Sequence, residues 1–318
     1  MDQTILVTGA AGFAGSHLLD LLGRQPAPVV AWRRPEDPLP PGRTGAGPAW
    51  MILDMLDREA VVAAVADVAP AAVYHCAGAA HVGQSWDRTY DTLAVNLLAT
   101  CHLLDALRLA GLRARVLIPG SALVYAMSDS AVDEGGRIAP ASPYALSKLA
   151  QEMAGLRMAR EEGLPVIVTR SFNHIGPRQH PSFFASSFAR QIARIEAGLA
   201  PPTLKVGNLE ARRDLTDVRD TVRAYRALVE GGRTGEVYNV CSGRAYRIQE
   251  ILDWLLARAR VPIAVSVDPA LYRPNDMPVM LGSFRRLRDE LGWEPKIPIE
   301  ETLNDLLDHW RGESSRLA

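Results

Sequence analysis

The chain has few cysteines, no long hydrophobic run and no excess of charge of one sign. Three widely spaced cysteines in 318 residues, without a Cys-x-x-Cys pair, argue against a disulfide framework. A net charge of −1 with interspersed acids and bases predicts neither nucleic-acid binding nor attachment to a membrane. No segment approaches the roughly 20 apolar residues of a membrane span, and the first residues lack the basic region of a signal peptide. We expect a cytoplasmic protein with no metal site and with reduced thiols at Cys76, Cys101 and Cys241.

Short apolar runs alternate with longer helical patterns over the first half of the chain. The runs are too continuously apolar for a half-exposed sheet. Their alternation with helices predicts right-handed crossovers and an α/β fold with a doubly wound parallel sheet, the Rossmann arrangement. The expected strands are Thr4–Thr8, Pro28–Trp32, Ala49–Leu53, Ala72–Cys76, Arg115–Gly120 and Val166–Ser171, and the expected helices are Phe13–Gly23, Arg58–Val68, Asp87–Ala110 and Pro143–Glu162.

This rhythm changes after about residue 171. Shorter helices and strands with many prolines and arginines follow, which indicates a smaller second lobe that selects the substrate. We expect a dinucleotide-binding domain over residues 1–171 and a mainly substrate-binding lobe over 172–318, with a segment near 218–243 that returns to the first domain. The proline- and glycine-rich segment 34–49 is expected to be a surface loop.

The first strand, turn and helix predict a phosphate-binding cradle. In ILVTGAAGFAGSHLLDLL, residues 5–22, Gly9, Gly12 and Gly15 allow a tight turn, close approach to a pyrophosphate and close helix–strand packing. The helix N-terminus then offers free N–H groups to the phosphates. The spacing is G-x-x-G-x-x-G, and its place in the first strand–helix connection favours dinucleotide binding over a simple packing turn.

The end of the second strand favours NADP over NAD. An NAD site places a carboxylate there for the ribose 2′-hydroxyl. The segment VVAWRR instead ends in Arg33 and Arg34, and the acids Glu36 and Asp37 come later. Guanidinium groups suit a 2′-phosphate through charge-assisted hydrogen bonds, so we expect NADPH, with NAD as the alternative.

Lysine is rare, and one of the few lysines stands where chemistry requires it. Only three of 35 basic residues are lysines, and Lys148 follows Tyr144 by four residues in SPYALSK, so both project from one helix face. A nearby ammonium can lower the pKa of a phenol, and its compact donors can also reach ribose hydroxyls. The preceding strand, VLIPGS, ends in Ser121, whose hydroxyl can hydrogen-bond a substrate oxygen. These three residues form a candidate catalytic set.

At these residues the chain resembles the extended short-chain dehydrogenase/reductase family. TGxxGFxG stands at Thr8–Gly15, followed by Ser121 and by Tyr144 with Lys148. Membership of that family implies a nucleotide-sugar substrate and further cofactor contacts. The residues that the resemblance assigns to the cofactor are Phe13, Ala14, Asp54, Met55, Cys76, Ala77, Gly78 and Phe172.

The second half is similar to GDP-4-keto-6-deoxy-D-mannose reductases and GDP-mannose 4,6-dehydratases. The similar segments are RSFNHIGPRQ, KVGNLEARRDLTDVRD, VYNVCSG and LYRPNDMP. The resemblance implies that His174 lies near the nicotinamide and that Asn173 and Arg213 hold the sugar nucleotide. It also implies that Arg273 binds the diphosphate and Asp276 a ribose hydroxyl.

One departure from the family pattern reduces the number of possible reactions. Dehydratases of this type carry an acid one or two positions after the catalytic hydroxyl, and this chain has Ala122 and Leu123 there. We expect an NADPH-dependent reductase of a nucleotide-activated 4-keto-6-deoxyhexose, most simply GDP-4-keto-6-deoxy-D-mannose to GDP-D-rhamnose or its 4-epimer. An NAD-dependent nucleotide-sugar 4-epimerase is the main alternative, and a GDP-mannose 4,6-dehydratase is less favoured. A nucleotide sensor without catalysis is disfavoured because all three catalytic residues are kept.

The helical segments Asp87–Ala110 and Tyr144–Glu162 are apolar over more than one face. Relatives pair these helices across a two-fold axis. The resemblance therefore implies a homodimer that is held together by a four-helix bundle.

The arginines after the second strand lead to a prediction on cofactor choice. NADPH should bind at least about tenfold more tightly than NADH, a difference of about 1.4 kcal/mol, because only NADPH offers a phosphate to the guanidinium groups. Combining Arg33→Ala with Arg34→Ala should remove most of that preference. Fluorescence titration with each cofactor measures it, and equal affinities in the unmodified protein would contradict the argument.

Overall fold

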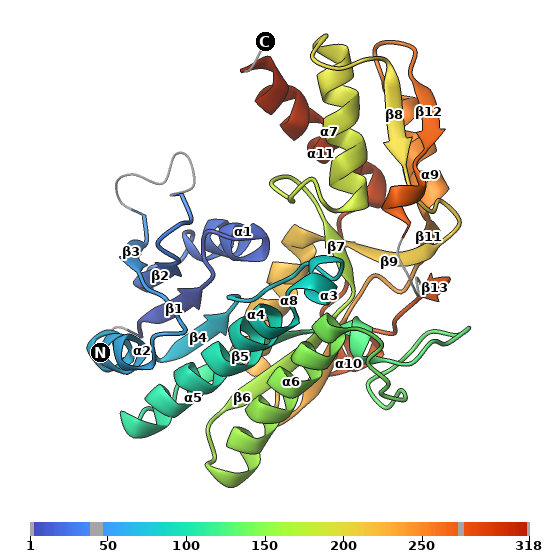
Figure 1. Cartoon of the computed structure of the whole chain (residues 1–318). Coiled ribbons are helices and arrows are strands. Elements are labelled where there is room, and N and C mark those ends of the chain that lie inside the picture. Colours follow the sequence, from blue (N-terminus) through green and yellow to red (C-terminus); the bar gives the residue numbers. More distant parts are fainter. Residues whose placement is uncertain (1–2, 39–46, 273–276, 317–318) are drawn as a thin grey trace.

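Seven parallel strands form the main sheet, in the order β10-β6-β5-β4-β1-β2-β3 (Figure 1). The computed structural model describes residues 3–38, 47–272 and 277–316. The predicted doubly wound parallel sheet is confirmed, and its first six strands agree with the predicted segments to within one residue at either end. The strands are β1 (Ile5–Thr8), β2 (Val29–Arg33), β3 (Ala49–Ile52), β4 (Ala72–His75), β5 (Arg115–Ser121), β6 (Val166–Ser171) and β10 (Val237–Val240).

Helices cover both faces of this sheet, which explains why its strands are apolar without alternation. Neighbouring strand residues such as Leu6 and Val7 point to opposite faces, and both are fully buried in separate clusters. The helices on the first face are α2 (Arg58–Val68), α5 (Ala99–Leu109) and α6 (Pro143–Glu161), and those on the second are α1 (Phe13–Leu22), α8 (Val218–Gly231) and α10 (Arg285–Leu291).

The direction of winding reverses beside β1. The chain runs outward from β1 through β2 to β3, then crosses back to β4 on the other side of β1. The connections that follow β1 and β4 therefore leave the sheet in different directions. In parallel α/β sheets this switch point opens the crevice in which nucleotides bind.

The second lobe has its own core. Helices α7 (Phe184–Glu196), α9 (Ile248–Leu256) and α11 (Ile299–Ser315) share a core with β8 (Thr203–Val206), and the exposed strand β12 (Ala264–Val267) pairs with β8. Figure 1 shows these elements together at one end of the molecule. A small second sheet lies between this core and the main sheet. Its strands are β7 (Asn173–Ile175), β9 (Arg212–Asp217), β11 (Ala245–Arg247) and β13 (Val279–Met280), and short 3-10 turns stand at Ala122–Val124 and Pro269–Leu271.

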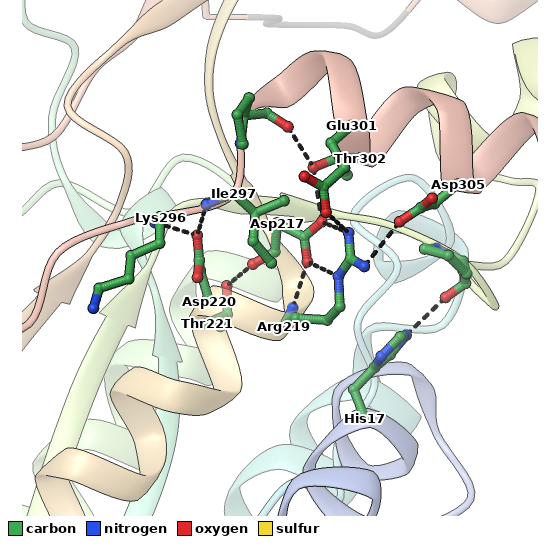
Figure 2. A network of polar contacts seen from close by, with 12 residues as sticks. His17, Asp217, Arg219, Asp220, Thr221, Lys296, Ile297, Glu301, Thr302 and Asp305 are labelled. Carbon is green, nitrogen blue, oxygen red and sulfur yellow. Dashed lines mark hydrogen bonds and ion pairs between the residues drawn. The ribbon is translucent and has the colours of Figure 1, made fainter.

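Asp217 joins the two parts of the chain at the start of α8 (Figure 2). Its buried carboxylate accepts hydrogen bonds from the backbone N–H of Arg219 at 2.7 Å and from the hydroxyl of Thr302 in α11 at 2.7 Å. The guanidinium of Arg219 pairs with the same carboxylate at 2.8 Å and with Asp305 in α11 at 2.8 Å. One buried acid thus caps α8, which packs on the main sheet, and hydrogen-bonds α11 in the second lobe.

The predicted helix Asp87–Ala110 is divided in the structure. After α3 (Gln84–Asp87) come α4 (Thr89–Leu93), a π-turn at Ala94–Leu98 and α5. We expected no segment to approach the length of a membrane span, but Thr89–Leu109 is long and apolar enough for one by length and composition alone. Half of this apolar stretch is buried within the protein, because α5 packs against α2 and α6. Of the predicted loop 34–49, residues 39–46 lie outside the described part.

Candidate active site

The predicted site residues gather at the carboxyl ends of the parallel strands. Segments from β1, β2, β3, β4, β5 and β6 each end in predicted cofactor or catalytic positions. Parallel strands present these ends at one edge of the sheet, so residues far apart in sequence meet there. The residues at this edge are Gly9, Gly12, Phe13, Ala14, Arg33, Asp54, Met55, Cys76, Ala77, Gly78, Ser121, Phe172, Asn173 and His174, with Tyr144 and Lys148 on the adjacent α6.

The glycine cradle is built by close backbone contacts. Gly9 has a φ of +61°, and a Cβ there would lie 2.5 Å from the backbone nitrogen of Ala77. A Cβ on Gly15 would lie 2.3 Å from the carbonyl oxygen of Gly9, so this glycine lets α1 approach β1. Gly12 is the N-cap of α1 and provides no side-chain cap, which leaves the first N–H groups of the helix for a ligand. The cradle fits a pyrophosphate.

The two arginines after β2 are not equivalent. Arg34 is an exposed side chain that pairs with Asp37 at 2.8 Å and with Glu36 at 3.1 Å. Arg33 is half-buried, and its Nη1 donates to the carbonyl oxygen of Asp37 at 2.5 Å. Its buried Nε has no hydrogen-bond partner within the described residues. An unpaired guanidinium N–H at this position fits the 2′-phosphate of NADP, and Arg33 is better placed than Arg34 to bind it.

Asp54 and Met55 follow β3 on the adenine side that the resemblance implies. Asp54 is exposed and its carboxylate accepts from the N–H of Leu56 at 2.9 Å, which fixes the turn. Met55 is buried, and its carbonyl oxygen contacts the Nδ1 of His102 at 3.0 Å. The carboxylate thus faces solvent while the methionine anchors the segment to α5.

Ser121, Tyr144 and Lys148 come together from β5 and α6. Ser142 caps α6 by accepting from the N–H of Ala145 at 3.1 Å, and this start sets Tyr144 and Lys148 on one face. Ser121 ends β5, and its Oγ accepts from the N–H of Leu123 at 3.2 Å. All three catalytic candidates are largely buried, with exposed fractions of 6–8%.

The pKa of Tyr144 is raised, which corrects the sequence argument. Burial is the larger cause, and a hydrogen bond with Ser121 opposes it. We expected the Lys148 ammonium to lower this pKa. In the structure that ammonium instead donates to the carbonyl oxygen of Pro119 at 2.9 Å and to Gln151 at 2.8 Å. Burial lowers the pKa of Lys148 to about 8.

Asn96 is a site residue that the sequence argument did not assign. It stands in the π-turn, fully buried, and grips Ala79 by accepting from its N–H at 2.8 Å and donating to its carbonyl at 3.1 Å. Its Nδ2 also donates to Ser147 in α6 at 2.8 Å. Asn96 therefore fixes the loop after β4 against the helix that carries Tyr144. The only sequence signal is a polar residue inside an apolar helical pattern.

Aromatic rings close the far side of the cradle. His174 stacks on Phe13 with ring centroids 5.6 Å apart and 13° between the planes. Burial lowers the pKa of His174, so the ring is neutral near pH 7. Phe172 is buried in an apolar cluster with Ala122 and Cys241. The structure thus joins the segment after β6 to the glycine turn.

The predicted substrate residues are only partly described. Asn173 and His174 lie in β7, which pairs with β9, and Arg213 lies in β9. The Nη1 of Arg213 donates to the carbonyl oxygen of Met277 at 2.7 Å. Arg273 and Asp276 lie outside the described residues.

A glycine cradle at the switch point of a parallel sheet, with a Ser–Tyr–Lys set beside it, defines an NAD(P)-dependent oxidoreductase of the short-chain dehydrogenase/reductase class. Residues 6–306 match the family model described as GDP-mannose 4,6 dehydratase, and the chain belongs to that family. The expected resemblance to nucleotide-sugar enzymes of the extended short-chain dehydrogenase/reductase family is confirmed.

Three relatives show how far the similarity extends. The chain is 38% identical to GDP-6-deoxy-D-mannose reductase of Pseudomonas aeruginosa, over 98% of each chain. The structure of RMD from Pseudomonas aeruginosa with NADPH is similar, with a TM-score of 0.85 and 36% identity over 98% of this chain and 99% of that one. UDP-glucose 4-epimerase of Thermotoga maritima with UDP-glucose has a TM-score of 0.86 and 25% identity over 98% and 99% of the two chains.

The geometry of Ser121, Tyr144 and Lys148 leads to a prediction on catalysis. Tyr144→Phe should remove the proton donor and lower turnover by a factor on the order of 10² to 10⁴, with NADPH affinity nearly unchanged. Lys148→Arg should also fail, since a planar guanidinium does not replace the compact ammonium. Steady-state kinetics and cofactor titration measure both effects. If Tyr144→Phe kept more than about a tenth of the activity, another group would be the acid.

Proposed function

We propose that this chain is an NADPH-dependent reductase of a GDP-linked 4-keto-6-deoxyhexose. The reaction is the reduction of GDP-4-keto-6-deoxy-D-mannose to GDP-D-rhamnose or its 4-epimer. The observation that carries the proposal is the Ser121–Tyr144–Lys148 set beside the cradle, in a chain 38% identical to a GDP-6-deoxy-D-mannose reductase over its whole length. The unpaired Nε of Arg33 supports NADPH as the cofactor.

The buried hydroxyls supply the proton side of the reaction. NADPH, when bound, provides the hydride for the keto carbon. Because the pKa of Tyr144 is raised, its phenol is protonated at neutral pH and is ready to donate to the substrate oxygen. Ser121 hydrogen-bonds the same developing alkoxide. Lys148 has a third N–H with no acceptor among the described residues, and this group is available to a ribose hydroxyl of the cofactor.

The second lobe supplies the groups for the nucleotide sugar. Asn173 and Arg213 stand on paired strands beside the catalytic edge, and both are half-buried. A fixed guanidinium and an amide at this place suit the oxygens of a sugar diphosphate. We assign Arg273 and Asp276 to the same substrate by the family pattern.

Two alternative reactions are less well supported. A 4,6-dehydratase and an NAD-dependent 4-epimerase each require an acidic residue at a position where this chain has none. A 4,6-dehydratase requires a base for a carbon-bound proton, and positions 122 and 123 carry Ala and Leu. A 4-epimerase remains the second candidate because its relative from Thermotoga maritima has the same fold at 25% identity. Arg33 and Arg34 in place of an acid after β2 speak against its usual NAD.

We further propose a cytoplasmic homodimer. Helix α6 packs beside α5, and the two helices and the π-turn before α5 expose large apolar side chains. Such a surface is commonly covered in a four-helix bundle with a second copy. The exposed side chains are Leu98, Leu109, Leu146 and Met153. All three cysteines are unpaired, as expected in a reducing compartment.

NADPH stoichiometry separates the reductase from the epimerase. The enzyme is mixed with NADPH and the 4-keto-6-deoxy product of a GDP-mannose dehydratase, and absorbance of the reduced nicotinamide is followed. We expect one equivalent of NADPH to be consumed per sugar, because the hydride ends on the substrate. Constant NADPH, with epimerisation of a 4-hydroxy nucleotide sugar, would replace the reductase by the epimerase.

Light scattering tests the dimer. We expect twice the mass of one chain at micromolar concentration, and a shift toward one chain when Leu146→Glu is combined with Met153→Glu, because both changes put charge into the shared apolar surface. Leu271→Glu, at an equally exposed leucine in the second lobe, is the matched control and should leave the mass unchanged. A monomer in the unmodified protein would rule out the dimer.

A further inference from the structure

Lys148 is held by neutral acceptors in a buried place. Its Nζ donates to the carbonyl oxygen of Pro119 at 2.9 Å and to the Oε1 of Gln151 at 2.8 Å. Sheet pairing of β5 with β4 ends at Leu117, two residues before Pro119, so this carbonyl lies beyond the shared ladder. An ammonium has three N–H groups. Two are used within the described chain, and one is left.

Gln151 is itself fixed from behind. Its Nε2 donates to the Oγ1 of Thr100 at 2.8 Å, and the hydroxyl of Thr100 donates to the carbonyl oxygen of Asn96 at 2.6 Å. Because the single hydroxyl proton of Thr100 is used on a carbonyl, every other group that contacts Thr100 must donate to it. This fixes the orientation of the Gln151 amide, with its NH₂ toward Thr100 and its oxygen toward Lys148. The reversed amide would turn its NH₂ toward an ammonium.

The same rule fixes the proton of a buried histidine. His75 Nε2 lies 2.9 Å from the Oγ1 of Thr100 and must donate to it. Burial lowers the pKa of His75 to about 3, so the ring is neutral and its Nδ1 carries no proton. That Nδ1 therefore accepts from the hydroxyl of Thr8 at 2.8 Å, and Thr8 accepts from the N–H of Ala77 at 3.2 Å. Along this chain of hydrogen bonds, those from Lys148 and from Thr8 therefore both point toward Thr100, whose hydroxyl donates in turn to Asn96.

This chain connects two parts of the candidate site. It begins at the ammonium on α6 and ends at Thr8, the last residue of β1 before Gly9. A Cβ on Gly78 would lie 3.6 Å from the Nζ of Lys148, so the ammonium stands against the loop that follows β4. All the linking side chains are buried to at least nine-tenths: Thr8, His75, Thr100, Lys148 and Gln151.

The geometry points to Gln151 as a positioning residue. Through Thr100 and His75 it ties the Lys148 ammonium to the phosphate-binding strand, and it directs the one remaining N–H of that ammonium to the cofactor. The inference rests on the proposed place of Lys148 beside the cofactor. Gln151 itself contacts neither cofactor nor substrate in this assignment.

Replacing Gln151 should change the titration of Lys148 in opposite directions. Gln151→Leu removes a neutral acceptor from the charged form, so the pKa of Lys148 should fall below its value of about 8. Gln151→Glu keeps the shape of the side chain and adds a negative charge, so the pKa should rise. Each shift should be about one unit. A side chain that only filled space would move the titration in neither direction.

The scarcity of lysine makes this measurable in the free protein. With ¹³C-lysine, the chain gives signals from only three lysines, and Lys205→Arg and Lys296→Arg assign them. The Cε signal of Lys148 is followed against pH without cofactor or substrate. Gln249→Leu, the same substitution in α9 of the second lobe, is the matched control. Thermal unfolding of each variant checks that the protein is folded, and Thr100→Val replaces any variant that is not.

The outcomes separate cleanly. We expect the midpoint to fall in Gln151→Leu, to rise in Gln151→Glu and to stay in Gln249→Leu, and we expect NADPH to bind at least about threefold more weakly to Gln151→Leu. Thr100→Val should lower the midpoint as Gln151→Leu does. An unchanged midpoint in Gln151→Leu, or unchanged NADPH affinity, would overturn the inference. Because the titration needs no substrate, it can succeed even if the proposed reaction is wrong.

Discussion

The close approach of the β1 and β4 backbones is the constraint on which the site depends. The two strands pair in register from Ile5 with Ala72 to Thr8 with His75. Directly beyond that pairing, Gly9 turns with a positive φ against the backbone of Cys76 and Ala77. A side chain at this position would push the phosphate turn away from the loop after β4. One glycine therefore decides whether the two halves of the cofactor crevice can form together.

Two buried cations of the described residues, Arg170 and Lys148, are stabilised in different ways. Arg170 forms a bidentate pair with Glu152, at 2.9 and 2.6 Å, and this carboxylate raises the pKa of Arg170 against the effect of burial. Lys148, four residues before Glu152 on α6, has only neutral oxygens as partners, and its pKa is lowered. The paired guanidinium of Arg170 links β6 to α6 through Glu152. An ammonium without a counter-ion keeps an N–H available for a ribose hydroxyl, at a cost in desolvation.

The local parts of this arrangement could be predicted from the sequence, and the long-range parts could not. The strands, the glycine turn and the spacing of Tyr144 and Lys148 depend on periodicity and on neighbouring residues, which the sequence displays directly. The contacts of Thr100 with Gln151 and with His75 join three separate elements, so no spacing in the sequence predicts them. The same limit explains why Lys148 was expected to act on the pKa of Tyr144. Its acceptors, Pro119 and Gln151, become visible only when β5 and α6 are packed together.

The apolar surroundings of the catalytic hydroxyl restrict the chemistry as much as the hydroxyl itself does. Ala122 is buried with Tyr125 and Phe172, and Leu123 packs against the same cluster. A carboxylate at either position would lose hydration in that cluster. The apolar packing therefore accounts for the absence, at these two positions, of a base that could remove a carbon-bound proton. What remains is proton transfer to an oxygen. A phenol whose pKa is raised by burial suits donation, whereas an epimerase must use the same group alternately as base and acid. The environment of Tyr144 and the residues after Ser121 thus favour the net reduction of a ketone.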